Sequence, residues 1–134
     1  MKVNLNEVID ALDFTNDEIK YYYNPKNGEI TMLNSMILKD SNEEQLDELF
    51  EKNIMLPTRY DINEYEMMED FIKTVKDLKI QNQLYISING HGAFRRFKDT
   101  CIYYSIINDW YKFRDKKYQK IAINWCKENN IEFE

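Results

Sequence analysis

The sequence predicts an α+β fold: an N-terminal helix and an antiparallel hairpin, part of a small three- or four-stranded sheet, pack with a mainly helical C-terminal part. Three patterns predict it: an amphipathic N-terminal segment with helix-start signals, one Asn-Gly turn between alternating apolar segments, and apolar residues at helical spacing further on. The chain has 134 residues, close to the commonest domain size. Because it contains no repeat, linker or low-complexity segment, a single domain over residues 1–134 is expected.

The N-terminal helix is predicted by a capping residue and by apolar residues at helical spacing. Asn4 is placed to cap the helix and Glu7 to complete a capping box. Apolar residues recur at helical spacing up to about Asp13. They are Leu5, Val8, Ile9 and Leu12.

The hairpin is predicted over Ile19–Asn24 and Glu29–Leu33. Apolar residues alternate in both segments, and the turn between them contains Pro25 and Asn27-Gly28, which favour a chain reversal. Ile54–Leu56 is a further short apolar segment, stopped by Pro57, and is expected to be a third strand. If the hairpin edge is open, Tyr21–Tyr23 would accept a partner strand.

Helices are expected in the rest of the chain. A Ser41/Glu44 capping box predicts a short helix with Leu46, Leu49 and Phe50 facing inward. An Asp61/Glu64 box predicts another helix, ending near Leu78. The segment Ile80–Asn89 is compatible with helix or strand, and helix is favoured because Gly90 is a natural helix stop. Helices are expected over Ala93–Tyr104 and Asp109–Asn129, and Ile131–Phe133 is expected to add an edge strand.

Bulk properties exclude several protein classes. The chain has only two cysteines, Cys101 and Cys126, with no metal-site or redox spacing, so both are expected to be reduced and partly buried. No signal-peptide segment or apolar membrane span is present. A cytoplasmic protein is therefore expected. The net charge of −6 argues against non-specific binding to nucleic acid or to an anionic membrane.

The charge is unevenly distributed along the chain. Residues 1–88 contain 9 basic and 18 acidic side chains, whereas residues 89–134 contain 9 basic and 6 acidic ones. The two parts either pack with complementary fields, which is the favoured interpretation, or the basic part receives an anionic ligand.

The best candidate for a binding site is the aromatic and basic segment Gly90–Asp115. It holds the only histidine and three of the four arginines. The Gly90-His91-Gly92 turn would leave free amides at a helix N-terminus, where nearby guanidinium groups could bind phosphate or carboxylate. The residues proposed to bind an anion are His91, Arg95, Arg96, Arg114 and Trp110.

Arg114 has a competing structural interpretation. It falls in an apolar stripe formed by Tyr111, Tyr118, Ala122 and Trp125. A buried charge there needs a partner, so Arg114 is expected to pair with an aspartate such as Asp99 or Asp61. On the preceding helix, Phe94, Phe97 and Cys101 are expected to share an inward face.

No set of residues identifies a catalytic or metal site. His91 is expected to be a solvent-exposed turn residue, and the acidic segments are expected to be solvated helix faces. No catalytic residue, metal ligand or cofactor is therefore assigned.

Several segments resemble a known family. They are Asp61–Tyr65 with Met68–Phe71, Gly90–Asp99 with its glycine pair, Trp110–Asp115, and Ile121–Asn129. Together they are similar to the uncharacterised protein family UPF0158, over nearly the whole chain. The resemblance implies a bacterial, cytoplasmic, single-domain protein and supplies no activity.

The sequence leaves three hypotheses for the function. The first is a non-catalytic binding or interaction module, whose C-terminal helices contact an anionic small molecule or a protein partner. The alternative is an enzyme acting on a phosphorylated or nucleotide substrate, with His91 or Asp99 as acid/base. A homodimeric structural protein is a third hypothesis.

Overall fold

The computed structural model describes residues 2–134, apart from the side chains of Ser35, Ile37 and Leu38. The chain forms two compact units. The first comprises the residues up to Ile62 together with Tyr118–Glu134, and the second comprises Asn63–Lys117. The division does not test the expectation of a single domain, which stays a prediction.

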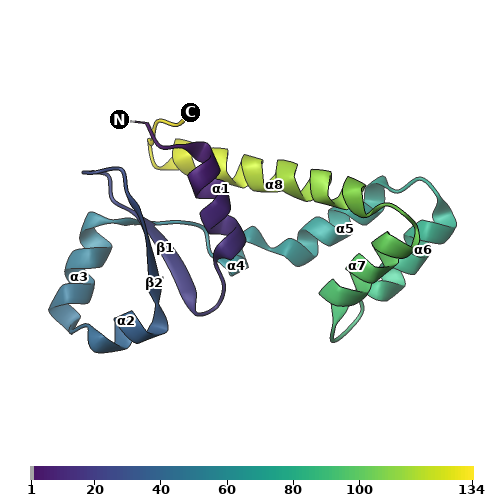
Figure 1. Cartoon of the computed structure of the whole chain (residues 1–134), viewed down its shortest axis with the longest axis horizontal. Helices are drawn as coiled ribbons and strands as arrows, with labels where there is room; N and C mark the ends of the chain where they lie inside the picture. Colours follow the sequence, from purple (N-terminus) through teal and green to yellow (C-terminus); the bar gives the residue numbers. More distant parts are fainter. Residues whose placement is uncertain (1) are drawn as a thin grey trace. The chain divides into compact units, whose positions relative to one another are not determined.

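The α+β class is confirmed by the order of the elements (Figure 1). Helices and a small antiparallel sheet come first, and helices alone follow. The elements are α1 (Leu5–Phe14), β1 (Ile19–Tyr23), β2 (Ile30–Asn34), α2 (Ser35–Asp40), α3 (Glu43–Lys52), β3 (Ile54–Met55), α4 (Arg59–Ile62), α5 (Glu64–Thr74), α6 (Leu78–Ser87), α7 (Ala93–Tyr103) and α8 (Ile107–Glu128).

The first unit begins with the predicted capped helix. The Asn4 side chain accepts a hydrogen bond from the Asn6 amide at 2.9 Å, which satisfies one of the free N–H groups at the start of α1. Val8 and Leu12 of the predicted stripe are fully buried.

The predicted hairpin is confirmed within one residue at each boundary. β1 and β2 pair antiparallel from Ile19↔Asn34 to Tyr23↔Ile30. Gly28 has a φ of 74°, which a residue without Cβ adopts at little cost. Its amide donates to the Asn24 carbonyl at 2.8 Å and closes the turn.

The third strand is also confirmed. It covers the edge of β1, the strand that contains Tyr21–Tyr23. β3 pairs with β1 through Tyr22↔Met55 and Tyr23↔Ile54, so the described sheet has the order β2-β1-β3. The hypothesis that Tyr21–Tyr23 offers an open edge was wrong, because β1 is the central strand and its hydrogen-bonding groups already meet neighbours on both sides.

The three predicted capping boxes differ from the observed caps. At α1, Asn4 caps through the Asn6 amide, and Glu7 does not complete a box with it. The other two boxes were placed at the wrong residues. The α3 box is formed by Asn42 and Gln45, not by Ser41 and Glu44. Asp61 accepts hydrogen bonds from the amide and hydroxyl of Thr58 at 2.9 and 3.0 Å, so it serves α4, while Asn63 caps α5. Asparagine caps a helix as well as serine or aspartate does, so spacing alone did not select the correct start.

One predicted helix end and one residue predicted to face inward also differ from the structure. α5 ends at Thr74, short of Leu78, because Asp77 begins a new helix by accepting from the amides of Lys79 and Ile80. Phe50 was expected to face inward but is half exposed, and its ring lies 5.8 Å from that of Tyr22.

Arg59 connects separate parts of the first unit. Its guanidinium donates to the carbonyl oxygens of Thr15 at 2.7 Å and Asp13 at 2.8 Å, at the end of α1. It also donates to the Tyr118 hydroxyl on α8 at 2.8 Å. The rigid, planar guanidinium can satisfy three acceptors at once, so one side chain holds α1, α4 and α8 in register.

The second unit is built around rings. Phe71 of α5 makes edge contacts with Phe97 of α7 and with Trp110 of α8, at centroid distances of 6.1 and 5.5 Å. The segment Ile80–Asn89 is helical as favoured up to Ser87, and α6 and α7 lie side by side (Figure 1). Gly90 and Gly92, with φ of 79° and 74°, form the turn between them.

The inward faces of α7 and α8 differ in part from those predicted. Phe97 and Cys101 are buried, but Phe94 is half exposed. On α8, Tyr111 is 45% exposed and its neighbour Trp110 is 1% exposed. The helical stripe is therefore rotated by one residue at its start, because Trp110 buries more apolar surface there than Tyr111 would.

The two ends of the chain meet at one β-bridge. Val3 and Phe133 form an isolated parallel bridge, so the expected C-terminal strand is reduced to one bridging residue. In residues 2–134, no helix is long and apolar enough to cross a membrane.

Both cysteines are free thiols, as predicted, and they are fully rather than partly buried. Burial raises the pKa of the Cys101 thiol to about 12 and also raises the pKa of Cys126. Because the thiolate is the nucleophile, neither sulfur is activated for chemistry near neutral pH.

The Arg59 contacts lead to a stability prediction. Replacing Arg59 with Met should lower the free energy of unfolding by about 2–3 kcal/mol, since the part-buried Thr15 carbonyl, the more exposed Asp13 carbonyl and the Tyr118 hydroxyl lose a charged donor. Tyr118→Phe removes one of the three bonds and should cost about 1 kcal/mol. Urea unfolding at pH 7 measures both, with Lys120→Met on the exposed side of α8 as a control near zero. Equal stability of Arg59→Met and Lys120→Met would contradict this role.

The raised thiol pKa values predict slow labelling. At pH 8, native protein should react with a disulfide reagent at least about a hundred times more slowly than urea-unfolded protein, whose thiols have ordinary pKa values near 8.5. Absorbance of the released thiolate follows the reaction. Rapid release of one equivalent from native protein would show that a thiol is accessible and ionised.

Candidate functional site

The three arginines proposed to bind an anion each have their own partners within the second unit. Arg96 donates from Nε to the Ser87 carbonyl at 3.1 Å, and its two terminal nitrogens donate to the carbonyl oxygens of His91 and Asn89. These carbonyls belong to the end of α6 and the following turn. Arg96 therefore closes the α6–α7 turn, and it fills the space beside Gly92, where an added Cβ would lie 3.1 Å from its guanidinium.

Arg114 forms an ion pair with Glu64. Nε of Arg114 donates to Oε1 of Glu64, and both side chains are 19% exposed. The expectation that Arg114 pairs with a carboxylate is confirmed, but the partner is Glu64, not Asp99 or Asp61. Glu64 begins α5, where a carboxylate also interacts favourably with the helix dipole.

Arg95 and His91 lie on the surface. The Arg95 side chain is 90% exposed and reaches Asp99 only at 3.9 Å, a distance typical of a weak surface pair. His91 is exposed in its turn. Within residues 2–134, no hydrogen bond joins its ring to Asp99, so the pairing required by the acid/base hypothesis is not formed in this structure.

Trp110 lies in the core of the second unit and not on a binding surface. Its ring packs against Phe97 and Phe71 at centroid distances of 4.9 and 5.5 Å. The indole Nε1 is buried and, among the described residues, has no hydrogen-bond partner. Leaving this donor unpaired costs free energy.

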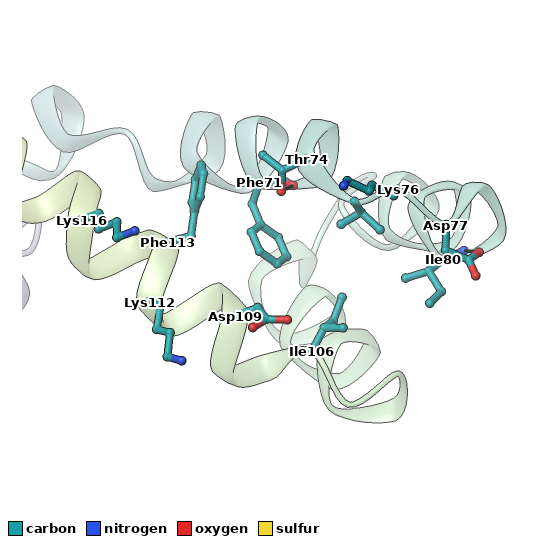
Figure 2. Close-up of a pocket in the computed structure, with 11 residues that line it drawn as sticks. Phe71, Thr74, Lys76, Asp77, Ile80, Ile106, Asp109, Lys112, Phe113 and Lys116 are labelled. Carbon is teal, nitrogen blue, oxygen red and sulfur yellow. Dashed lines mark hydrogen bonds between the residues drawn. The ribbon is translucent and has the colours of Figure 1, made fainter.

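The structure shows a pocket that the sequence interpretation did not identify. It has a volume of about 530 Å³ and lies within the second unit, in the size range of small-molecule sites. Figure 2 shows the rings of Phe71 and Phe113 between the helices that carry them, with Lys112 and Lys116 on α8. The lining residues are Phe71, Thr74, Val75, Lys76, Asp77, Ile80, Ile106, Asp109, Lys112, Phe113 and Lys116.

The floor of this pocket is apolar and held in place. Phe71 is buried and packs edge-on against Phe113 at 5.4 Å. The Thr74 hydroxyl donates to the Phe71 carbonyl at 2.6 Å. Offset and edge contacts of this kind fix ring orientation, so a flat apolar ligand would meet a preformed surface.

The rim of the pocket carries three lysines without ion-pair partners among the described residues: Lys76, Lys112 and Lys116. Two acids are also present, but each lies at a helix start. Asp77 accepts from two amides at the start of α6, and Asp109 lies in the first turn of α8. Helix N-termini offset negative charge, so the rim favours an anion.

The spacing of the lysines in the sequence is compatible with a shared site. Lys112 and Lys116 are four residues apart on either side of Phe113, so a helix places them on one face. Arginine is the usual residue for bidentate anion binding, but here the planar groups of Arg96 and Arg114 satisfy internal acceptors.

Comparison with known proteins places the chain in a family. The model of the uncharacterised protein family UPF0158 matches residues 1–134. The chain belongs to this family. It is also similar to a UPF0158 protein of Pseudomonas aeruginosa, with 20% identity over 137 residues, covering 98% of this chain and 86% of that protein. No solved structure gives a significant match. The resemblance seen in the sequence is confirmed, and the family description names no activity.

The contrast between Arg114 and Arg95 predicts different stability effects. Arg114→Met should lower the free energy of unfolding by about 2–3 kcal/mol, because it leaves the partly buried Glu64 carboxylate without its partner. Arg95→Met should change it by less than about 0.5 kcal/mol, since that pair is exposed. Urea unfolding of the two variants measures the difference. Similar losses from both would show that the Glu64 pair is not a structural contact.

Proposed function

We propose that the protein is a cytoplasmic, non-catalytic binding module whose pocket in the second unit takes a small molecule with an apolar body and an anionic group. The observation that supports this is a phenylalanine floor bordered by Lys76, Lys112 and Lys116. Apolar walls with a few charged groups are typical of ligand sites, where burial provides affinity and charge provides orientation.

The proposal keeps the binding interpretation of the C-terminal helices but changes its residues. Lys112, Phe113 and Lys116 all belong to α8, within residues 89–134, where basic side chains outnumber acidic ones. Their ammonium groups have no ion-pair partners among the described residues, whereas Arg96 and Arg114 are engaged internally. An anion at the rim would therefore gain attraction without first breaking an ion pair.

The test compares two ligands of nearly the same shape, 2-naphthoate and its neutral counterpart 2-naphthamide. We expect 2-naphthoate to bind more tightly, because only it carries a negative charge for the lysines. At a concentration 100 times its Kd, it should stabilise the protein by about 2.7 kcal/mol. Binding should weaken with added salt, because exposed charges are screened. Calorimetric titration and thermal unfolding measure these effects.

The matched variants are Lys112→Gln with Lys116→Gln, against Lys98→Gln on the exposed side of α7. The double variant should weaken 2-naphthoate binding about tenfold, since each exposed charge contributes up to about 1 kcal/mol. Lys98→Gln should leave it unchanged. Equal binding of naphthoate and naphthamide, or equal effects of the two sets of variants, would contradict an anion-binding pocket.

A further inference from the structure

A second pocket lies within the first unit and has the opposite charge. Its volume is about 400 Å³. It is formed by the chain around β3 and by the last turns of α8. The lining residues are Met55, Leu56, Pro57, Asp61, Ile121, Asn124, Trp125 and Glu128.

The inner wall of this pocket is apolar and fixed. Leu56 and Trp125 are buried. The Trp125 indole Nε1 donates to the Met55 carbonyl at 3.0 Å, and its ring meets Tyr23 edge-on at 6.0 Å. Because the indole is held both by a hydrogen bond and by a ring contact, it presents a preformed surface to an apolar chain or to a cation.

The rim carries two carboxylates and no lysine or arginine. Asp61 keeps its position through the two hydrogen bonds that its Oδ2 accepts from Thr58. Glu128 is exposed and is the last residue of α8. A helix C-terminus carries partial negative charge, which disfavours a carboxylate there. A cation bound beside Glu128 would relieve this repulsion.

We propose that this pocket binds a small organic amine, a primary ammonium group carried on an aliphatic chain. The ammonium group has three donors, and Asp61, Glu128 and the Asn124 side-chain oxygen are acceptors at the rim. The aliphatic chain would lie against Trp125, Ile121 and Met55. An organic cation suits the lining better than a metal ion, since no group of three or more His, Cys, Asp or Glu able to hold a metal occurs among the described residues.

The test uses 1,5-diaminopentane with pentane-1,5-diol as the uncharged match. The two tryptophans serve as separate reporters in a proton–nitrogen NMR spectrum of the whole protein. The indole signal of Trp125 should shift and saturate with the diamine and not with the diol. The indole signal of Trp110, in the second unit, should stay in place. No saturable shift of Trp125, or the same shift with the diol, would overturn the proposal.

Two variants test whether binding depends on the negative charge of Glu128. Glu128→Gln keeps size and polarity and should weaken diamine binding about fivefold, the effect of one exposed charge pair. Glu132→Gln removes an exposed acid outside the pocket and should have no effect. Unchanged binding by Glu128→Gln, or equal weakening by both variants, would show that binding is non-specific attraction to an acidic protein. The outcome is independent of naphthoate binding, so either proposal can fail alone.

Discussion

The helical period of α8 is the constraint on which both units depend. Its 22 residues supply Trp110 and Arg114 to the second unit and Tyr118 and Trp125 to the first. A helix repeats every 3.6 residues, so within each unit the buried side chains of α8 recur on one side of the helix. Each candidate pocket takes one wall from this helix: Lys112, Phe113 and Lys116 in one case, and Ile121, Asn124 and Trp125 in the other.

The charged side chains fall into two groups: those bonded within the protein, and those at the rims of the candidate pockets. Guanidinium groups that lie near carbonyl or carboxylate groups are used internally, as Arg59, Arg96 and Arg114 are. An internal bond to a charged group holds elements together but leaves less capacity for an outside ligand. The lysines around Phe113 and the acids beside Trp125 remain at rims over apolar floors, where a ligand of opposite charge could contact both.

The predictable elements were those specified by neighbouring residues. The Asn27-Gly28 turn and the Asn4 cap act over a few residues, and both were found as expected. The start of α3 was missed by one residue, because Asn42 and Ser41 are equally good caps and only the packed helix decides between them. The prediction that Arg114 pairs with a carboxylate was correct, but the predicted partners were wrong. The actual partner, Glu64, is fifty residues away in the chain, and sequence spacing does not show which distant acid packs against α8.

The sequence by itself determined the α+β class, the hairpin, the C-terminal helices, the family and the buried reduced cysteines, because periodicity, turn chemistry and composition are local properties of the chain. Tertiary structure alone decided that β1 is the central strand, that Trp110 rather than Tyr111 is buried, and which cations are paired internally. It also created the two pockets. Their walls come from segments far apart in the chain, and the packing that joins such segments minimises unpaired buried groups and empty space over the whole unit.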